Sequence, residues 1–335
     1  MIRRCLKVYL CLSKRIWRRL PHSLKKRPVG RAYGRHLHAV VCRCSTRNQN
    51  HSTFFLRNRP EMELMCRLVR RKPPGAEVAI SVLACSKGAE VYSILWSIRR
   101  ARPDLKVTLQ AVDISQEIVD FAKEGAYSLK GPTSLKALDH LGMTKEEKLT
   151  WFTYRDQGLH ESASIFERMD ESEMDAMFDR EGDAVKVKSW LKEGITWRLG
   201  DAIAPELVDE LGVQDVVVAN RFLCHMEAAT AEKCLRNIAR LVKPGGYIFV
   251  SGVDLDVRTK VAKELGWKPV PDLIREVHEG DFSVTEGWPL QWWGLEPFSE
   301  DYPDWKIRFA SVFRVGGSPS FKRDDAPAGV LGSAK

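Results

Sequence analysis

The chain has 335 residues, and its formal net charge of +9 is unevenly distributed along the sequence. Residues 1–60 hold sixteen Lys or Arg and no acid, whereas residues 61–335 hold thirty-seven bases and forty-four acids. A chain of this length can bury enough apolar surface to fold without disulfides or metals. It has no run of eighteen apolar residues, which argues against a membrane-spanning helix, and Val8–Ser13 is too short for a secretory signal.

Residues 1–50 form a basic N-terminal extension. This density of positive charge attracts anionic lipid, nucleic acid or an acidic protein, but it is also typical of a solvated arm without structure. Several apolar residues fall near one helical face, as in a helix that lies on a membrane surface. These are Ile2, Leu6, Tyr9, Leu10, Ile16, Trp17 and Leu20. We expect the extension to be partly amphipathic or disordered, and residues 1–35 are a candidate for peripheral membrane contact.

The eight cysteines are irregularly spaced, and several lie inside apolar runs, where a reduced thiol packs like a small hydrophobic group. This pattern favours a reducing, cytoplasmic compartment. Cys42 and Cys44 are too close together for a usual zinc-binding pair, and no second pair has a matching spacing. The sequence therefore predicts no metal site.

From residue 60 onward, helical and strand periodicities alternate, which predicts an α/β fold with a parallel sheet. The first predicted elements are a helix at 61–71, a strand at 78–84, a helix at 89–100, a strand at 107–112 and a helix at 116–124.

Residues 129–181 break this alternation and contain eight acids between Glu161 and Glu181, so we expect a helical acidic insertion over the sheet. The alternation resumes with strands at 195–199, 215–219 and 247–252 and a helix at 228–242.

The sequence from Lys243 to Gly246, Lys-Pro-Gly-Gly, predicts a turn between the last of these helices and the strand that follows it. A further helix is expected at 257–265, and the apolar run 307–315 predicts strands of a terminal hairpin. Residues 316–335 offer almost nothing to bury and are expected to be a disordered tail.

The most informative stretch is Val78–Ser97 followed by Val107–Asp113, which reads as strand, small-residue turn, helix, strand and acid. The small residues around Cys85 allow a ligand to approach the backbone, and Gly88 permits a sharp turn. Asp113 lies twenty-five residues beyond Gly88, near the offset at which a Rossmann-like unit presents an acid to ribose hydroxyls. Asp113 can also serve as a cap for the next helix.

Several motifs then resemble one family, in the same order along the chain. Thr53-Phe-Phe-Leu-Arg57 is similar to a Thr-x-Phe-Phe-Arg segment, and Ala84-Cys-Ser-Lys-Gly-Ala-Glu-Val-Tyr-Ser93 is similar to Ala-Cys-Ser-Thr-Gly-Glu-Glu-Pro-Tyr-Ser. Ala111-Val-Asp-Ile-Ser115 and Ala122-Lys-Glu-Gly-Ala-Tyr-Ser128 continue the likeness. These segments resemble the CheR family, the S-adenosylmethionine-dependent methyltransferases that esterify glutamates of bacterial chemoreceptors. The resemblance spans residues 51–252 and extends more loosely to 315.

The resemblance implies a seven-stranded, Rossmann-like class I methyltransferase sheet with helices on both faces, in a domain at 51–315. It implies that Glu90 meets the amino group of S-adenosylmethionine, Asp113 its ribose, and Asp201 and Ala202 its adenine. Glu90 can alternatively cap its helix, and Asp201 can start a turn. Carboxylates suit a sulfonium and an ammonium, whereas a pyrophosphate cofactor would call for backbone donors. The remaining expected cofactor contacts are Thr53, Arg57, Ala84, Cys85, Gly88, Asn220 and Arg221.

The chain departs from the family at three places. Asn220 and Arg221 stand in exchanged order, His225 replaces a Tyr beside the reacting methyl, and Ala89 replaces the first Glu of the turn. A glutamate acceptor, with a pKa of about 4.3, is already an anion and needs no base, so position and dehydration would suffice, with Arg57 as a suitable guide for its oxygen. For an amine or hydroxyl acceptor, His225 is the candidate base; a satisfied, half-buried histidine is the alternative interpretation.

The sequence thus predicts a methyltransferase acting on a protein carboxylate, with a receptor-like protein as partner. The family's N-terminal helical domain and its receptor-tethering β subdomain are not recognisable in the sequence. One alternative is a sensor or scaffold that binds the cofactor without turnover. Another is an RNA methyltransferase, disfavoured because the Asn/Asp-Pro-Pro-aromatic signature of base N-methylation is absent. An NAD-dependent dehydrogenase ranks last, since Cys85 and Lys87 interrupt any Gly-x-Gly-x-x-Gly turn.

Overall fold

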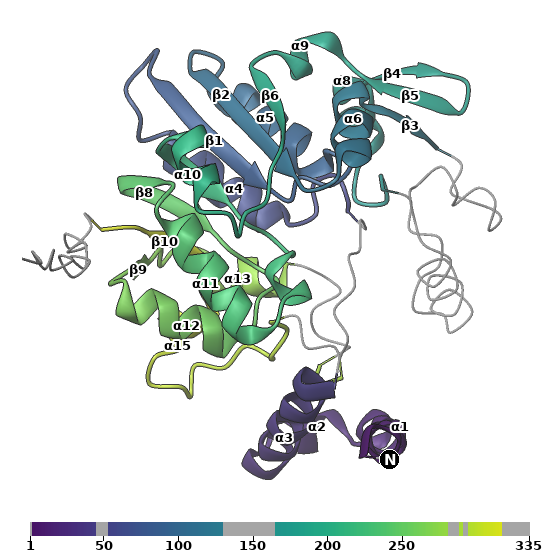
Figure 1. Cartoon of the computed structure of the whole chain (residues 1–335). Helices are drawn as coiled ribbons and strands as arrows, with labels where there is room; N and C mark the ends of the chain where they lie inside the picture. The colour runs from purple at the N-terminus through teal and green to yellow at the C-terminus, as the bar shows by residue number, and fades with distance from the viewer. Residues whose placement is uncertain (1, 45–52, 130–164, 281–287, 291–293, 317–335) are drawn as a thin grey trace, which may run out of the picture.

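The computed structural model describes residues 2–44, 53–129, 165–280, 288–290 and 294–316, and seven of its strands form one sheet (Figure 1). In spatial order these strands are β6 (Ile195–Leu199), β2 (Lys106–Asp113), β1 (Glu77–Leu83), β7 (Gln214–Val218), β8 (Val242–Phe249), β10 (Val312–Arg314) and β9 (Lys268–Pro269). In this sheet β10 runs antiparallel to both of its neighbours, β8 and β9, and the other strand pairs are parallel. Numbered along the chain, the order is 3-2-1-4-5-7-6, which confirms the predicted class I methyltransferase sheet.

Helices cover both faces of this sheet because its central strands are apolar on both sides. On one face, Ile80 and Val82 of β1 pack with α4 (Arg59–Val69) and α5 (Ala89–Ala101). On the other, Val217 and Ile248 pack with helices that come later in the chain. These are α10 (Glu206–Leu211), α11 (Ala228–Ala239) and α12 (Leu255–Glu264).

A second, three-stranded antiparallel sheet lies beside α6 (Gln116–Glu124) in Figure 1. Its order is β3 (Ala126–Ser128), β5 (Ala184–Val187) and β4 (Phe178–Glu181). In strands of three or four residues the alternation of apolar and polar residues is too short to recognise, so the sequence does not predict them. Of the expected insertion at 129–181, residues 130–164 lie outside the described residues. The remainder contributes α8 (Glu171–Met177) as well as β4, and α9 (Ser189–Lys192) follows β5.

An aromatic cluster joins this small sheet to the segment ahead of α4. The Phe55 ring lies 5.4 Å from Tyr127, 5.4 Å from Phe166 and 5.0 Å from Phe178, measured between ring centroids. Phe55 is fully buried and belongs to the core. The small sheet therefore fixes the position of the chain just before Arg57.

The N-terminal extension forms three helices, α1 (Ile2–Arg19), α2 (His22–Lys26) and α3 (Pro28–Cys44). Of the two alternatives expected for this extension, partly amphipathic or disordered, residues 2–44 are helical and not a disordered arm. Trp17 packs edge-on against Trp288 at 5.6 Å between ring centroids, and Leu37 is buried in the same cluster.

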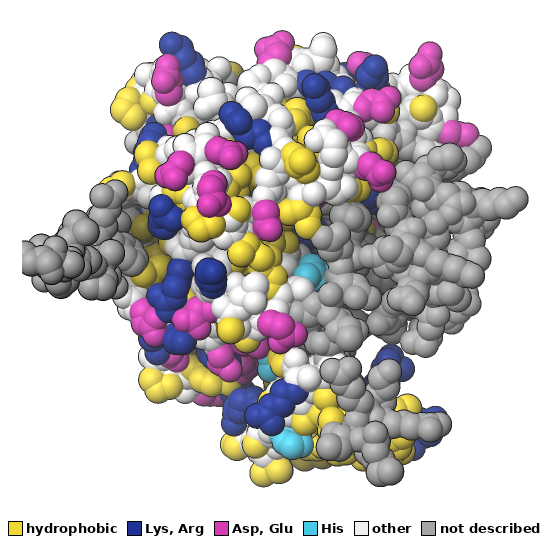
Figure 2. All heavy atoms as spheres, in the orientation of Figure 1, with side chains coloured by type: hydrophobic (Ala, Val, Ile, Leu, Met, Phe, Trp, Pro, Cys, Tyr) yellow, Lys and Arg dark blue, Asp and Glu magenta, His cyan; other side chains and the backbone are white. Residues whose placement is uncertain are grey.

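The lobe formed by these helices carries basic and apolar side chains on its surface (Figure 2). Val8, Leu12 and Ile16 recur every four residues along α1, and each is more than half exposed. No helix within the described residues is long and apolar enough to cross a bilayer. Peripheral membrane contact by residues 1–35 stays a prediction.

Two predictions near the C-terminal end are wrong. Residues 305–309 form the helix α15 (Trp305–Phe309) instead of a strand, because tertiary packing of the fully buried Phe309 against His278 and Phe298 overrides β propensity. The strand that follows, β10, does not close a hairpin but inserts between β8 and β9. The helix α13 (Ile274–Glu279) lies between β9 and α15 in sequence.

The Lys-Pro-Gly-Gly segment is an irregular part of β8 and not a turn outside the sheet. Its pairing with β7 shifts register between Gln214 and Val216. A Cβ at Gly246 would lie 2.8 Å from the carbonyl oxygen of Asp215, so only glycine fits where the two backbones approach.

Gly34 gives a test of how the N-terminal lobe docks. A Cβ at this position would lie 2.4 Å from the Trp288 ring. Gly34→Ala should therefore destabilise the protein by about 1–3 kcal/mol through overpacking, although alanine favours an isolated helix by about 1 kcal/mol. Urea unfolding followed by tryptophan fluorescence measures this change. Ala32→Gly, at an exposed position of the same helix, is the control and should lower the stability only by the difference in helix propensity. A Gly34→Ala variant that is more stable than wild type would contradict the packing described.

Candidate active site

The expected site residues converge on one edge of the sheet, where β1, β2, β6 and β7 end. The order of the strands reverses between β1 and β7, the position at which open α/β sheets bind ligands. Two backbone hydrogen bonds tie the loops together at this edge. Cys85 N donates to Val112 O at 2.9 Å, and Gly200 N donates to Asp113 O at 2.9 Å. The structure thus brings together segments that are separated by more than a hundred residues in the sequence.

The turn between β1 and α5 holds an unusual backbone. Ala84 and Ser86 have φ angles of 54° and 50°, a region that residues with a side chain seldom adopt, and Gly88 has a φ of 82°. Such strain persists where surrounding structure imposes it, and it is concentrated at ligand sites. Burial raises the pKa of the Cys85 thiol well above its usual value, so this cysteine is a packing residue and not a nucleophile.

Asp113 ends β2 with a buried carboxylate held by the backbone. Its Oδ2 accepts a hydrogen bond from Ser86 N at 2.9 Å, and its Oδ1 accepts one from Ser115 N at 3.2 Å. A carboxylate offers about four acceptor positions, so each oxygen retains one for a further donor. The geometry therefore suits a pair of adjacent hydroxyls. The hydrogen bond from Ser115 N also agrees with the alternative interpretation, in which Asp113 caps α6. The cofactor role of Asp113 stays a prediction.

Asp201 and Ala202 both have structural roles. Asp201 is exposed, and its Oδ1 accepts a hydrogen bond from Ile203 N at 2.9 Å, as in an Asx turn. Ala202 is buried, and its carbonyl oxygen accepts a hydrogen bond from Asn237 Nδ2 at 3.1 Å. The turn interpretation of Asp201 is thus what the structure displays, and its contact with adenine stays a prediction.

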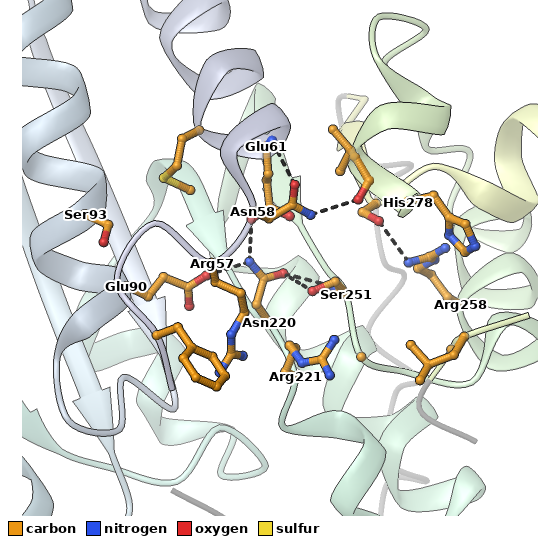
Figure 3. Close-up of a pocket in the computed structure, with 17 residues that line it drawn as sticks. Arg57, Asn58, Glu61, Glu90, Ser93, Asn220, Arg221, Ser251, Arg258 and His278 are labelled. Atoms are coloured by element: carbon orange, nitrogen blue, oxygen red, sulfur yellow. Dashed lines mark hydrogen bonds between the residues drawn. The ribbon is translucent and has the colours of Figure 1, made fainter. Parts of the chain in front are cut away.

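A small cavity of about 40 Å³ lies at this edge of the sheet (Figure 3). The segments that follow β7 and β8 line it, together with residues of α4 and α5. Its charged lining consists of three arginines and two glutamates from distant parts of the chain. They are Arg57, Arg221, Arg258, Glu61 and Glu90.

Asn220 organises the cavity by bridging its two carboxylates (Figure 3). Its Nδ2 donates to Glu61 Oε1 at 2.7 Å and to Glu90 Oε1 at 2.8 Å. Its Oδ1 accepts hydrogen bonds from Ser251 N at 3.0 Å and from Ser251 Oγ at 2.8 Å. The amide of Asn220 is therefore fully engaged with the protein, which makes it a positioning residue for Glu90.

Burial shapes the ionisation of the cavity. Burial raises the pKa of Glu90, opposed by the hydrogen bond from Asn220 and by the charges of Arg57 and Arg221. Burial lowers the pKa of Arg258 to about 9, which leaves it charged at neutral pH. With both glutamates ionised, the three guanidinium groups still outnumber the carboxylates, and the cavity favours an anion.

The segment containing Thr53 and Arg57 covers one side of this cavity. Arg57 lies over the ring of Phe54 at 5.5 Å, and Arg168 lies over the same ring at 5.0 Å. Phe54 is half-buried and lines the cavity. Leu56 turns the chain with a φ of 50°, and its N–H donates to Ser93 Oγ at 2.9 Å. Thr53 is half-buried just ahead of Phe54.

Arg221 and His225 follow β7 but differ in their placement. Arg221 lines the cavity with a φ of 59°, and its N–H donates to Ser251 O at 2.9 Å. A Cβ at Gly252 would lie 2.5 Å from the Cα of Arg221, so glycine is required beside this turn. His225 ends the 3₁₀ helix η2 (Leu223–His225), half-buried, and is not among the residues that line the cavity.

The sequence does not predict three ionisable residues of this cavity, namely Glu61, Arg258 and His278. Each lies in a helix without a recognisable motif, and the fold alone brings them together. Arg258 donates from Nη1 to Val250 O at 2.8 Å and from Nη2 to Arg308 O at 3.0 Å. Burial lowers the pKa of His278 to about 4, so its imidazole is neutral near pH 7, with Nε2 2.8 Å from Glu296 O.

Two family models match successive parts of the chain. The S-adenosylmethionine-binding domain of the CheR methyltransferases matches residues 50–146, and a methyltransferase domain matches residues 171–250. A comparison with curated proteins gives no match.

The solved structures that match the chain share little sequence with it, and their TM-scores are low. Precorrin 8w decarboxylase of Methanobacterium thermoautotrophicum is 15% identical over 62% of this chain and 74% of its own, with a TM-score of 0.30. An N-methyltransferase from Bradyrhizobium japonicum with S-adenosyl-L-homocysteine is 12% identical over 63% and 76%, at 0.31. Magnesium protoporphyrin IX methyltransferase from Synechocystis with bound S-adenosylmethionine is 11% identical over 63% and 69%, at 0.32. The fold assignment therefore rests on the strand order.

Glu90→Gln tests the electrostatics of the cavity. Since folding raises the pKa of Glu90 above its ordinary value of 4.5, the native state binds this proton more tightly than the unfolded state does. The wild type therefore loses stability as the pH rises from about 4.5 through the raised value. Glutamine retains the oxygen that accepts a hydrogen bond from Asn220 but removes the charge. The variant should therefore have a higher free energy of unfolding in urea than wild type at pH 8, and this difference should be smaller at pH 4. The exposed Glu77→Gln, which removes a charge outside the cavity, is the control. A Glu90→Gln variant that is less stable than wild type at pH 8 would contradict the argument.

Proposed function

Because the chain is an S-adenosylmethionine-dependent methyltransferase with a cofactor-binding region of the CheR type, we propose that it esterifies a carboxylate of a protein side chain. The observation that carries this proposal is the arginine-rich cavity beside Glu90. Arg57, Arg221 and Arg258 line it together, and a carboxylate is the protein side chain that guanidinium groups bind best.

The residues at the sheet edge fit the cofactor. Asp113 has acceptor positions left for two hydroxyls, and Glu90 supplies negative charge for an ammonium or sulfonium. When bound, S-adenosylmethionine would supply an activated methyl. The acceptor oxygen would form the new bond to carbon as the carbon–sulfur bond breaks, and sulfur would keep the electron pair. In the proposal, Arg57 and Arg221 hold the acceptor carboxylate in line and keep water away.

The cavity also supports an acceptor that needs no general base. Among the described residues that line the cavity, the one histidine is His278, which is buried and hydrogen-bonded to a backbone carbonyl. His225, the base expected for an amine or hydroxyl, lies outside this lining. A carboxylate at neutral pH has no proton to lose, so it is the acceptor class that the available groups can serve.

The reaction can be tested with tritiated S-adenosylmethionine and lysate from the source cells. A carboxylate acceptor predicts label on protein that is insensitive to RNase and is released as methanol in alkali, because esters hydrolyse and methylamines do not. Arg57→Ala should lower the rate of labelling by roughly 10–100-fold, the loss expected for one charged hydrogen bond. Arg67→Ala, a surface change on α4, should leave the rate unchanged. Alkali-stable label would refute the ester, and cofactor binding without any label would favour a sensor or scaffold.

Asp113→Asn tests the cofactor contact separately from the acceptor. Asparagine keeps one acceptor oxygen but loses the charge, so the affinity for S-adenosylhomocysteine should fall by roughly 10–100-fold. Isothermal titration calorimetry measures this loss, with circular dichroism as a check on folding. Asp120→Asn, on the exposed face of α6, is the matched control. Equal affinities for the two variants would remove Asp113 from the binding site.

A further inference from the structure

A second cavity, of about 410 Å³, lies between the N-terminal lobe and the methyltransferase domain. His38 and Cys42 on α3 line it from one side, and Asp254 at the start of α12 lines it from the other. These three residues are partly buried, and their ligand atoms lie within 4.8 Å of one another. The cluster takes no part in the proposed methyl transfer.

The separations between the three ligand atoms match those around a tetrahedral metal. His38 Nε2 lies 3.3 Å from Asp254 Oδ2, and Cys42 Sγ lies 3.6 Å from each of these atoms. Zinc bonds are about 2.0–2.1 Å to histidine nitrogen, 2.3 Å to cysteine sulfur and 2.0–2.2 Å to carboxylate oxygen. At tetrahedral angles these lengths place nitrogen and oxygen about 3.3–3.5 Å apart, and sulfur about 3.5–3.7 Å from either. A zinc ion would thus fit with little movement of the side chains.

The local structure holds each ligand in position. His38 and Cys42 are four residues apart on α3, so they project from the same face of the helix. Asp254 caps α12, with its Oδ1 accepting a hydrogen bond from Asp256 N at 2.9 Å. This leaves Oδ2 directed at His38 and Cys42. One nitrogen, one thiolate and one carboxylate oxygen form a donor set that suits zinc and not magnesium or calcium.

We propose that His38, Cys42 and Asp254 bind a zinc ion, with the fourth position open to the cavity. Such an ion would cross-link α3 to α12, two elements that are separated by more than two hundred residues. Val41, beside Cys42, packs against Cys224 of η2. Gly294 and Leu295 line both this cavity and the arginine-rich one. The zinc ion therefore fastens the N-terminal lobe against a wall of the site at the sheet edge.

Metal binding by the full-length chain, freed of any affinity tag, tests this proposal. The wild-type protein should retain one zinc per chain by mass spectrometry after dialysis. With Co²⁺ alone as the probe, it should give the intense visible bands of a tetrahedral site and a thiolate charge-transfer band. Cys42→Ser should lose the charge-transfer band and weaken zinc binding by more than about tenfold, because a ligand contributes at least as much as its supporting shell. His38→Gln should weaken binding to a similar extent.

Matched controls lie on the same helix. Cys44→Ser and His36→Gln replace a cysteine and a histidine that are outside the cluster, and both should bind zinc and cobalt as wild type does. A wild-type chain that gives no cobalt–thiolate band would overturn the proposal and leave a His38–Asp254 ion pair with a neighbouring thiol. The proposal would also be wrong if the band survived in Cys42→Ser or disappeared equally in Cys44→Ser.

Discussion

The candidate site depends on one buried amide, that of Asn220, lying between two carboxylates. Glu61 is almost fully enclosed, and Glu90 shares the same cavity, so without a donor between them the two acids would repel each other. Because the Asn220 oxygen is also bonded to Ser251, the amide cannot rotate freely. These hydrogen bonds fix the ends of β7 and β8 relative to the helices α4 and α5. The cavity that the three arginines line therefore has a defined shape.

The exchanged order of Asn220 and Arg221 acquires a physical meaning in this setting. With asparagine two residues after the end of β7, its short side chain reaches inward to the acids. The next residue turns through a left-handed conformation and directs a guanidinium into the cavity, which Gly252 allows by leaving room. The departure from the family pattern thus retains one polar bridge and one cation at this corner.

Much of the parallel sheet could be predicted from the sequence, because long apolar strands and amphipathic helices have clear periods. The turn at Ala84–Gly88 and the acid Asp113 were found for the same reason, since they follow strands. Glu61, Arg258 and the pairing of His38 with Asp254 could not be found, because each depends on contacts between remote segments. The helix at 305–309 was missed because burial of Phe309 outweighs local preference.

The insertion of β10 between β8 and β9 has a consequence for biosynthesis. The two strands it separates are made well before it. Until residues 312–314 leave the ribosome, β8 is paired only with β7, and β9 lacks its one partner in the sheet. Until then, the outer edge of β8 exposes unpaired backbone groups, the kind of edge that recruits foreign strands. The nascent protein is therefore most vulnerable to aggregation late in its synthesis, when most of the sheet has formed and its closing strand has not.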